Sequence, residues 1–320
     1  GGVKMKIVCY KDKILKAINS VVKGVASKTT MPILEGILIQ TNDNEIKLTT
    51  YDLEIGIEYI MECEVKEQGS TVVNAIMFSE IIRKLPDTEI YISVNDKNLL
   101  EIECEGSLYK LATMNPDEFP ELPKIEIENS IEVDQNILKN MIRKTIFAVS
   151  SEESRPIFTG CLFEVESNKL SLVAVDGFRL ALRSIYLNKQ TNNFSAVIPG
   201  KTLNEVNKII SDSFEPVKIG VAKNQALFEM DNCKVVTRIL DGEIFRDAIS
   251  GARLEKLMPV LINDVEYTNK DMKKFKKAPY GLCYGDNKEI HNSKGEIIEI
   301  RQSRCDFYGN KQLVSSVKIN

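Results

Sequence analysis

The chain has 320 residues, with 42 Lys and Arg, 46 Asp and Glu, and a formal net charge of −4. Hydrophobic residues make up 43% and charged residues 28%, a composition typical of globular proteins with a packed core and not of disordered chains. Only one histidine is present, which disfavours most acid–base enzymes. No apolar run reaches the length of about 18 residues that a membrane helix needs, so we expect no membrane partner. Seven scattered cysteines without a CxxC pair favour reduced thiols and a cytosolic location.

The first half of the chain predicts helices and strands in a definite order. Residues 1–4 precede Met5 and are interpreted as a cloning scar or an upstream extension. Asp12 is expected to cap a helix whose apolar residues, from Ile14 to Val22, recur at helical spacing. Strands are predicted over residues 36–41, 45–50 and 55–64, a helix over 77–84, which Pro86 ends, and a hairpin over 89–94 and 99–104.

The second half repeats this order. A helix is predicted over residues 136–146, followed by strands over 160–165, 169–175 and 179–187. A further helix over 201–211 and strands over 217–222 and 226–230 complete the series. Short strands interrupted by two helices indicate an antiparallel α+β domain with its helices on one face of the sheet.

Four pairs of segments recur at an almost constant offset of 123 to 125 residues. Residues 14–16 (ILK) recur at 137–139, and residues 31–36 align with 155–160. Residues 51–53 (YDL) align with 175–177 (VDG), and 78–80 (FSE) align with 203–205 (LNE). A repeat this long indicates domains with separate cores rather than a solenoid. We therefore expect a first module over residues 5–126, a second module over 127–247, and an atypical, truncated or replaced third region over 248–320.

Basic residues lie on the polar side of each predicted helix. Lys13 and Lys16, three residues apart, and Lys139 and Arg143, four apart, each share a helix face. A solvated helix face would explain any one helix alone. All four predicted helices carry basic residues on their polar side, although the chain as a whole is acidic. This pattern favours one surface that contacts nucleic-acid phosphates. Base-reading residues are scarce there, so the contact is expected to be independent of sequence.

No catalytic or cofactor motif accompanies this pattern. The chain has no glycine-rich phosphate loop, no metal-ligand spacing and no paired catalytic carboxylates, so we predict a protein without cofactors that is not an enzyme. Asp52 and Asp176 each follow a predicted strand at the same place in the two modules. This duplication favours a structural role in a turn over a role in an active site.

Several segments resemble the bacterial DNA polymerase III beta subunit, the family of beta sliding clamps. They include residues 31–34 (MPIL), 50–54 (TYDLE), 82–86 (IRKLP), 118–123 (EFPELP), 154–160 (SRPIFTG), 173–181 (VAVDGFRLA) and 198–201 (IPGK). They follow the family's order from about residue 5 to residue 243.

The resemblance implies a ring of repeated clamp domains that encircles duplex DNA, with helices lining the inner face. It implies a homodimer in the bacterial cytosol that tethers the replicative DNA polymerase and is opened by an ATP-driven clamp loader. Together with the helix pattern, it assigns DNA contacts to Lys13, Lys16, Lys28, Arg83, Lys84, Lys139, Arg143, Lys201 and Lys208. It also implies a pocket for partner peptides, whose second-module wall corresponds to Phe158, Val175, Gly177, Phe178, Arg179 and Leu180. Without the resemblance, Phe158 and Leu180 could equally be ordinary core residues.

The resemblance ends near residue 243. Residues 244–320 are fewer than a third module needs, and they show no third set of repeated segments. They could be a diverged third domain, an unrelated module fused to a clamp body, or a segment that does not fold well. We therefore expect a weakened or absent ring. The alternatives to a clamp are a decoy that binds partner peptides without encircling DNA, and a clamp body that carries an unrelated module.

Overall fold

The structure, a computed structural model, describes residues 5–241 apart from residues 28, 124, 126, 153 and 177–179. Beyond residue 241 it describes only the backbone of five strands: β18 (Val260–Ile262), β19 (Val265–Tyr267), β20 (Asp286–His291), β21 (Ile297–Cys305) and β22 (Lys311–Lys318).

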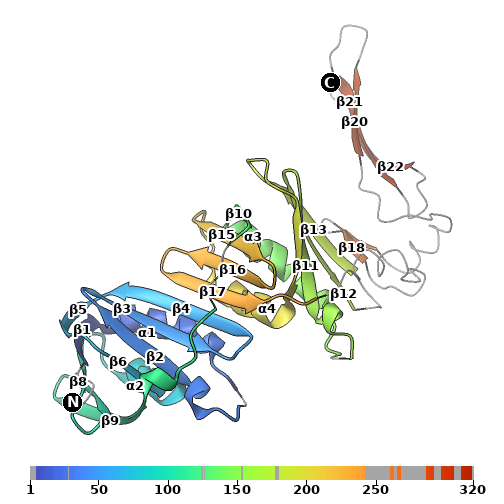
Figure 1. Ribbon diagram of the computed structural model, residues 1–320. Helices are drawn as coiled ribbons and strands as arrows, with labels where there is room; N and C mark the ends of the chain where they lie inside the picture. Colours follow the sequence, from blue (N-terminus) through green and yellow to red (C-terminus); the bar gives the residue numbers. More distant parts are fainter. Residues whose placement is uncertain are drawn as a thin grey trace.

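The strands of the first module form one continuous curved run, against which its two helices pack (Figure 1). Helix α1 (Lys11–Val21) buries Ile14, Ala17, Ile18 and Val21, which lie on one helix face because they are three or four residues apart. Helix α2 (Ala75–Lys84) begins at Asn74, whose side chain accepts a hydrogen bond from the Met77 amide at 3.0 Å. The strands are β1 (Met5–Tyr10), β2 (Gly36–Asn42), β3 (Glu45–Tyr51), β4 (Ile55–Glu62), β5 (Glu64–Glu67), β6 (Ser70–Asn74), β7 (Glu89–Val94), β8 (Leu99–Cys104) and β9 (Ser107–Met114). They follow one another in the run in the order β4-β3-β2-β6-β9-β8-β7-β1-β5.

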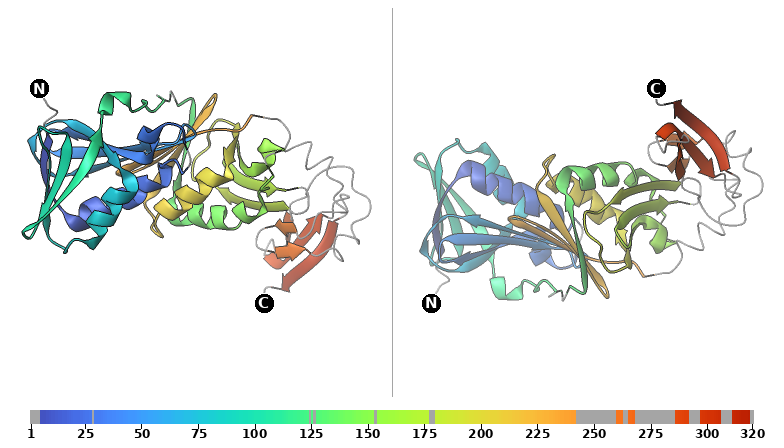
Figure 2. Two further views of the ribbon diagram at one scale, coloured as in Figure 1. Left: turned by 90° about the horizontal axis from the view of Figure 1, so that it is seen from below. Right: turned by 90° about the horizontal axis from the view of Figure 1, so that it is seen from above.

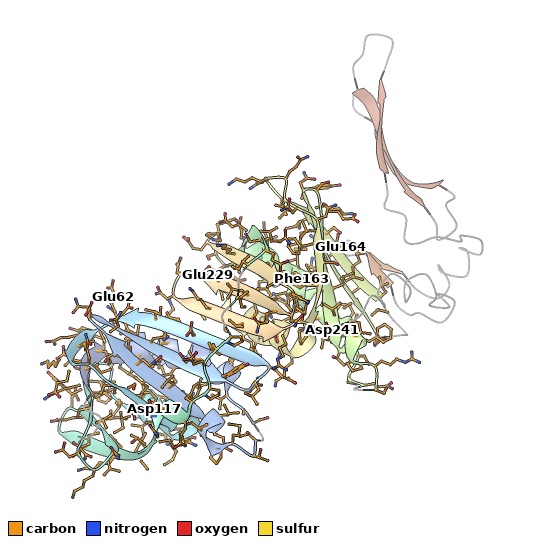
Figure 3. All side chains as sticks on the ribbon, viewed as in Figure 1. Glu62, Asp117, Phe163, Glu164, Glu229 and Asp241 are labelled. Carbon is orange, nitrogen blue, oxygen red and sulfur yellow. The ribbon has the colours of Figure 1, made fainter. Side chains whose placement is uncertain are left out.

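The second module has the same order of elements. Its helices are α3 (Gln135–Arg143) and α4 (Gly200–Ile209). Its strands are β10 (Asn129–Asp134), β11 (Gly160–Glu166), β12 (Lys169–Val175), β13 (Leu180–Tyr186), β14 (Phe194–Pro199), β15 (Pro216–Ala222), β16 (Gln225–Met230) and β17 (Cys233–Arg238). The rings of Phe163 and Phe228, 6.2 Å apart and at 79° to each other, join the two sheets of this module (Figure 3).

Strand register shows that the sequence repeat is a structural repeat. Gly36 pairs with Asn74 across β2 and β6, and Gly160 pairs with Pro199 across β11 and β14. The two pairs are related by offsets of 124 and 125 residues. The predicted antiparallel α+β modules therefore agree with the structure.

One continuous sheet joins the two modules. Strand β17 of the second module pairs antiparallel with β4 of the first, from Cys233 opposite Tyr59 to Thr237 opposite Ile55. This pairing joins β10, β15, β16 and β17 of the second module to the strands of the first in one 13-stranded sheet with the order β10-β15-β16-β17-β4-β3-β2-β6-β9-β8-β7-β1-β5, while β11–β14 belong to a separate six-stranded sheet. A backbone ladder of this kind fixes the relative position of the two helix pairs.

Two predictions about helix ends are wrong. Asp12 does not cap α1, because strand β1 runs directly into the helix and Tyr10 is the residue before its first turn. The third helix ends at Arg143 instead of Ile146, and a short 3₁₀ turn (Ile146–Ala148) follows. The Thr145 hydroxyl there donates to the Met141 carbonyl oxygen at 2.9 Å, a contact that competes with continued helix.

The elements missing from the sequence prediction are mostly short strands. They are β1, β5, β6, β9, β10, β14 and β17. Strands β1 (MKIVCY) and β17 (CKVVTR) do not alternate apolar and polar residues along their length, because each has three consecutive buried residues, so the period-2 signal of a strand is weak there. None of the described helices is long and apolar enough to cross a membrane.

Candidate nucleic-acid interface

The α-helices of the described residues lie in a row on one side of the strands (Figure 2). In both modules the helices pack against the same side of the shared sheet, so their outward faces form one surface. We call this surface the helix face. The backbone ladder between β4 and β17 gives it continuity across the two modules.

The first module supplies exposed basic side chains to the helix face. Lys13 and Lys16 are exposed on α1, and Arg83 and Lys84 are exposed in the last turn of α2. Arg83 donates a hydrogen bond from Nη2 to the Ser79 hydroxyl at 3.2 Å. Within the described part of the chain, none of these four side chains has a carboxylate within 4 Å. Lys28, the fifth residue predicted for this module, lies outside the described residues.

The second module also places its predicted basic residues on this face, but three of them are paired with acids. Lys139 Nζ lies 3.1 Å from Asp212, Lys201 Nζ lies 2.8 Å from Asp52, and Lys208 Nζ lies 2.7 Å from Glu205. Arg143 is exposed at the end of α3. The positive charge of the second module is therefore largely balanced by its own surroundings.

The Asp52–Lys201 pair crosses the junction between the modules. One carboxylate oxygen of Asp52 accepts hydrogen bonds from the amides of Glu54 at 3.0 Å and Ile55 at 2.7 Å, and the other contacts Lys201. The predicted turn role of Asp52 is thus confirmed. Partial burial lowers the pKa of Lys201, but attraction to Asp52, assisted by Glu54 and Glu205, outweighs it and raises the pKa overall.

Glu205 extends this cluster toward the first module. Burial lowers the pKa of Lys23, at the end of the α1 segment, and the charge of Glu205 partly offsets that shift. Glu205 therefore acts electrostatically on lysines of both modules. We call Asp52, Glu205, Lys23, Lys201 and Lys208 the junction cluster.

Sequence reasoning found the lysines of this cluster but missed their acidic partners. Asp52 and Lys201 are 149 residues apart, and only the fold brings them together. Glu205 and Lys208, in contrast, are three residues apart on a predicted helix, so their pairing could have been expected.

Of the predicted peptide-pocket residues, the structure describes Phe158, Val175 and Leu180. Val175 pairs with Leu180 across β12 and β13, and both side chains are 1% exposed, as expected for core residues. Phe158 is half-buried in the 3₁₀ turn before β11. Gly177, Phe178 and Arg179 lie outside the described residues.

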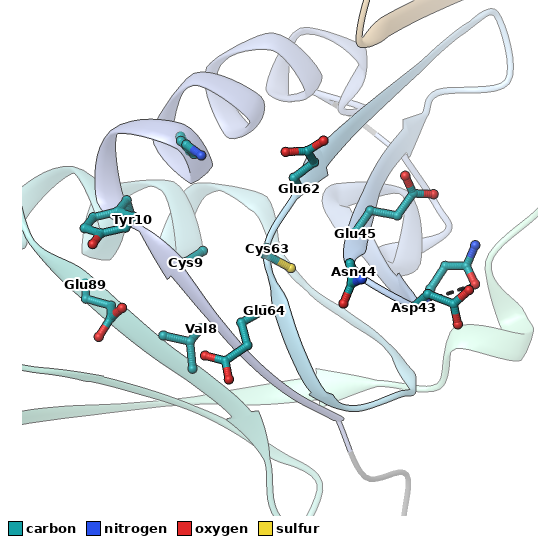
Figure 4. A pocket seen from close by; sticks show the side chains of 12 residues that line it. Val8, Cys9, Tyr10, Asp43, Asn44, Glu45, Glu62, Cys63, Glu64 and Glu89 are labelled. Atoms are coloured by element: carbon teal, nitrogen blue, oxygen red, sulfur yellow. Dashed lines mark hydrogen bonds between the residues drawn. The ribbon is translucent and has the colours of Figure 1, made fainter.

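A cavity of about 720 Å³ in the first module has the opposite charge character (Figure 4). Five carboxylates line it, from Asp43, Glu45, Glu62, Glu64 and Glu89, together with the single lysine Lys13. The excess of carboxylates repels phosphate, so Lys13 lies in a less favourable setting for a phosphate contact than the other basic residues of its module. No group of three or more potential metal ligands is found among the described residues.

Comparison with known proteins identifies the family. The model of the DNA polymerase III beta subunit N-terminal domain matches residues 5–123, and that of the central domain matches residues 132–245. The chain is 39% identical over 250 residues to the beta sliding clamp of Halalkalibacterium halodurans, covering 75% of this chain and 66% of that protein. It is 36% identical over 272 residues to the beta sliding clamp of Bacillus subtilis, covering 82% and 72%.

Solved structures agree with this result. A DNA polymerase III beta subunit from Eubacterium rectale superposes with a TM-score of 0.75 at 31% identity, covering 98% of this chain and 86% of that chain. The DNA polymerase sliding clamp from Bacillus subtilis gives a TM-score of 0.74 at 29% identity, covering 98% and 85%. The chain spans about two thirds of the length of the curated relatives it matches. From its repeated modules and these matches, the chain belongs to the bacterial beta sliding clamp family, the DNA polymerase III beta subunits.

Proposed function

We propose that this protein is a DNA sliding clamp, a processivity factor that encircles duplex DNA and contacts its phosphates through the helix face. It carries out no catalysis. The observation that supports this most strongly is the gathering of exposed basic side chains on one side of two joined modules. The DNA-contacting set comprises Lys13, Lys16, Lys28, Arg83, Lys84, Lys139, Arg143, Lys201 and Lys208.

On the opposite sheet face, two lysines of the described residues are paired with acids. Lys47 pairs with Glu58 at 3.3 Å, and Lys234 pairs with Glu229 at 3.0 Å, on strands whose alternate residues pack toward the helices. Phosphates are therefore attracted to the helix face. Contacts between exposed charges are weak and screened by salt, which allows the protein to move along the duplex without a sequence preference.

The proposed partners are those that the family implies. A replicative DNA polymerase would be tethered by a short peptide at the wall formed by Phe158, Val175, Gly177, Phe178, Arg179 and Leu180, and an ATP-driven loader would open the ring. The relatives include a DNA polymerase sliding clamp from Bacillus subtilis, which supports the assignment to DNA replication.

Ring closure is where this chain is expected to differ from the family. The family models match residues 5–123 and 132–245, and residues 244–320 show no third set of the repeated segments. A weakened or absent ring therefore remains our prediction. The second candidate function is a decoy that binds partner peptides without encircling DNA. Sedimentation showing a stable two-chain ring at micromolar concentration would contradict the prediction.

Retention on circular DNA separates the two functions. The full chain is loaded onto a nicked plasmid with a clamp loader and ATP, and the bound fraction is isolated by gel filtration. A clamp stays on the circle and is lost after the plasmid is cut once. A decoy shows no retention on either form but still binds a polymerase-derived peptide. Retention that survives linearisation would refute topological binding.

A further inference from the structure

The acidic residues of the junction cluster sit beneath the lysines that they contact. The side chain of Asp52 is 8% exposed and that of Lys201 is 63% exposed. Glu205 is 16% exposed, whereas Lys208 is 51% exposed. Solvent, and anything that approaches the helix face, therefore meets the ammonium groups first.

This arrangement differs from ion pairs on the opposite face. In Lys47–Glu58 and Lys234–Glu229 the two partners are exposed to similar degrees, 38% and 25% in the first pair and 46% and 33% in the second. Of the four ion pairs compared, the two in the junction cluster combine a largely buried acid with an exposed lysine, and the two on the opposite face do not.

We propose that Asp52 and Glu205 act as internal substitutes for phosphate. They compete with DNA for Lys201 and Lys208 and so lower the affinity of the helix face for DNA. This inference rests on the proposed function and names residues that set the strength of DNA binding. A lysine can form its strongest charge-assisted contact with either its own carboxylate or a DNA phosphate. While it stays with the carboxylate, it neutralises no phosphate and displaces no counterion from the duplex.

Geometry favours exchange over permanent pairing. Both lysine side chains are more than half exposed, so their ion pairs are screened and easily broken. Asp52 is held in place independently of Lys201, because its other oxygen accepts two backbone amides. The carboxylate therefore stays in position when the lysine leaves, and it recaptures the lysine when a phosphate moves on. Such exchange would keep each contact short-lived, as sliding requires.

The test is the salt dependence of DNA binding by the full chain. Binding to a fluorescein-labelled 30-base-pair duplex is followed by anisotropy between about 50 and 300 mM KCl, and log K is plotted against log salt. The test variant is D52N/E205Q, which removes both negative charges, while the remaining amide oxygen at position 52 can still accept the backbone hydrogen bonds from Glu54 and Ile55. The matched control is E58Q/E229Q, which removes two carboxylates from ion pairs on the opposite face. Circular dichroism and thermal melting verify that both variants fold.

We expect D52N/E205Q to bind more tightly at low salt and to steepen the slope by up to about 1.8, at about 0.9 for each released lysine. The control should keep the wild-type slope. Equal slopes in wild type and D52N/E205Q, or an equal change in the control, would overturn the inference while leaving the proposed function intact. If neither wild type nor D52N/E205Q binds the duplex, the proposed function fails and the inference fails with it.

Discussion

The helices of the first module and those of the second carry basic side chains on the same side of the protein, but in different electrostatic settings. Lys16, Arg83 and Lys84 of the first module have no carboxylate within 4 Å in the described structure. Lys139, Lys201 and Lys208 of the second module each contact one. A structural repeat therefore does not imply a functional repeat. The difference suggests that the first module holds phosphate more firmly, whereas the second provides exchangeable contacts.

Removing three charges from each module should show the largest difference. K16A/R83A/K84A is expected to lower the salt-dependence slope of duplex binding by up to about 2.7, at about 0.9 per lost contact. K139A/K201A/K208A removes the same charge and should lower it clearly less, because its lysines are already balanced. Anisotropy titrations at several salt concentrations measure both slopes. Equal losses would show that the acidic partners do not matter.

The two modules also differ in what covers the start of the strand that follows Asp52 or Asp176. The segment between β9 and β10, residues 115–128, is called the linker. Leu122 of this linker packs on Gly56 of the first module, and a Cβ added to Gly56 would lie 2.2 Å from Leu122 Cδ2. In the second module the position at an offset of 124 is Leu180, whose own side chain is buried. Gly56→Ala should therefore displace the linker and destabilise the protein by about 1–2 kcal/mol.

Chemical unfolding of Gly56→Ala and of a comparison variant, Gly220→Ala, tests this packing. A Cβ at Gly220 would meet Ile127 of the same linker at 3.0 Å, a less severe contact. We expect a smaller loss for Gly220→Ala. A larger loss there would mean that the linker is held mainly by the second module.

Buried thiols make both modules sensitive to alkaline pH. Burial raises the pKa of Cys9 in the first module and of Cys161 in the second to about 12, but the two positions are not equivalent, because the first module has Ile37 where the second has Cys161. Below pH 9 the Cys161 thiol is protonated in both the folded and the unfolded state, so its full stabilising contribution is present. Between about pH 9 and pH 12 only the unfolded state loses the proton, and stability falls by up to about 1.4 kcal/mol per pH unit for this thiol.

Cys161→Ser removes that titration with little change in size. The free energy of unfolding of the variant should fall less steeply than that of the wild type from pH 9 to pH 10.5. Guanidinium titrations at each pH provide the measurement. Parallel curves would show that ionisation of Cys161 does not contribute.

The smallest expected effect concerns Leu53, which has a φ of +73° where the aligned residue of the second module is Gly177. A left-handed conformation costs a leucine about 1–2 kcal/mol, and the greater freedom of glycine in the unfolded chain offsets part of any gain. Leu53→Gly should therefore stabilise the protein by about 0.5 kcal/mol. A destabilised variant would indicate that the half-exposed leucine side chain makes a contact worth more than this strain.

The sequence was sufficient to predict the repeat, the α+β class and the basic helix positions, because these depend on local spacing. The buried face of α1 could be read from the spacing of Ile14, Ile18 and Val21. The beginning of the same helix could not, because the way in which β1 runs into α1 depends on tertiary contacts such as the hydrogen bond from Lys11 N to Thr88 O.

The sequence alone also could not show which of the lysines are paired with an acid. Whether Lys201 is balanced by an acid depends on the pairing of β4 with β17, which brings the turn at Asp52 to the start of α4. Neighbours in sequence could reveal only the Glu205–Lys208 contact.

The location of DNA on the helix face is tested most directly by lysine footprinting. The full chain is acetylated briefly with and without saturating duplex DNA, and modification is quantified by peptide mass spectrometry. The account predicts that Lys16 and Lys84 become protected, while Lys47 and Lys234 on the opposite sheet face react at unchanged rates. Protection of Lys47 and Lys234 without protection of Lys16 and Lys84 would contradict it.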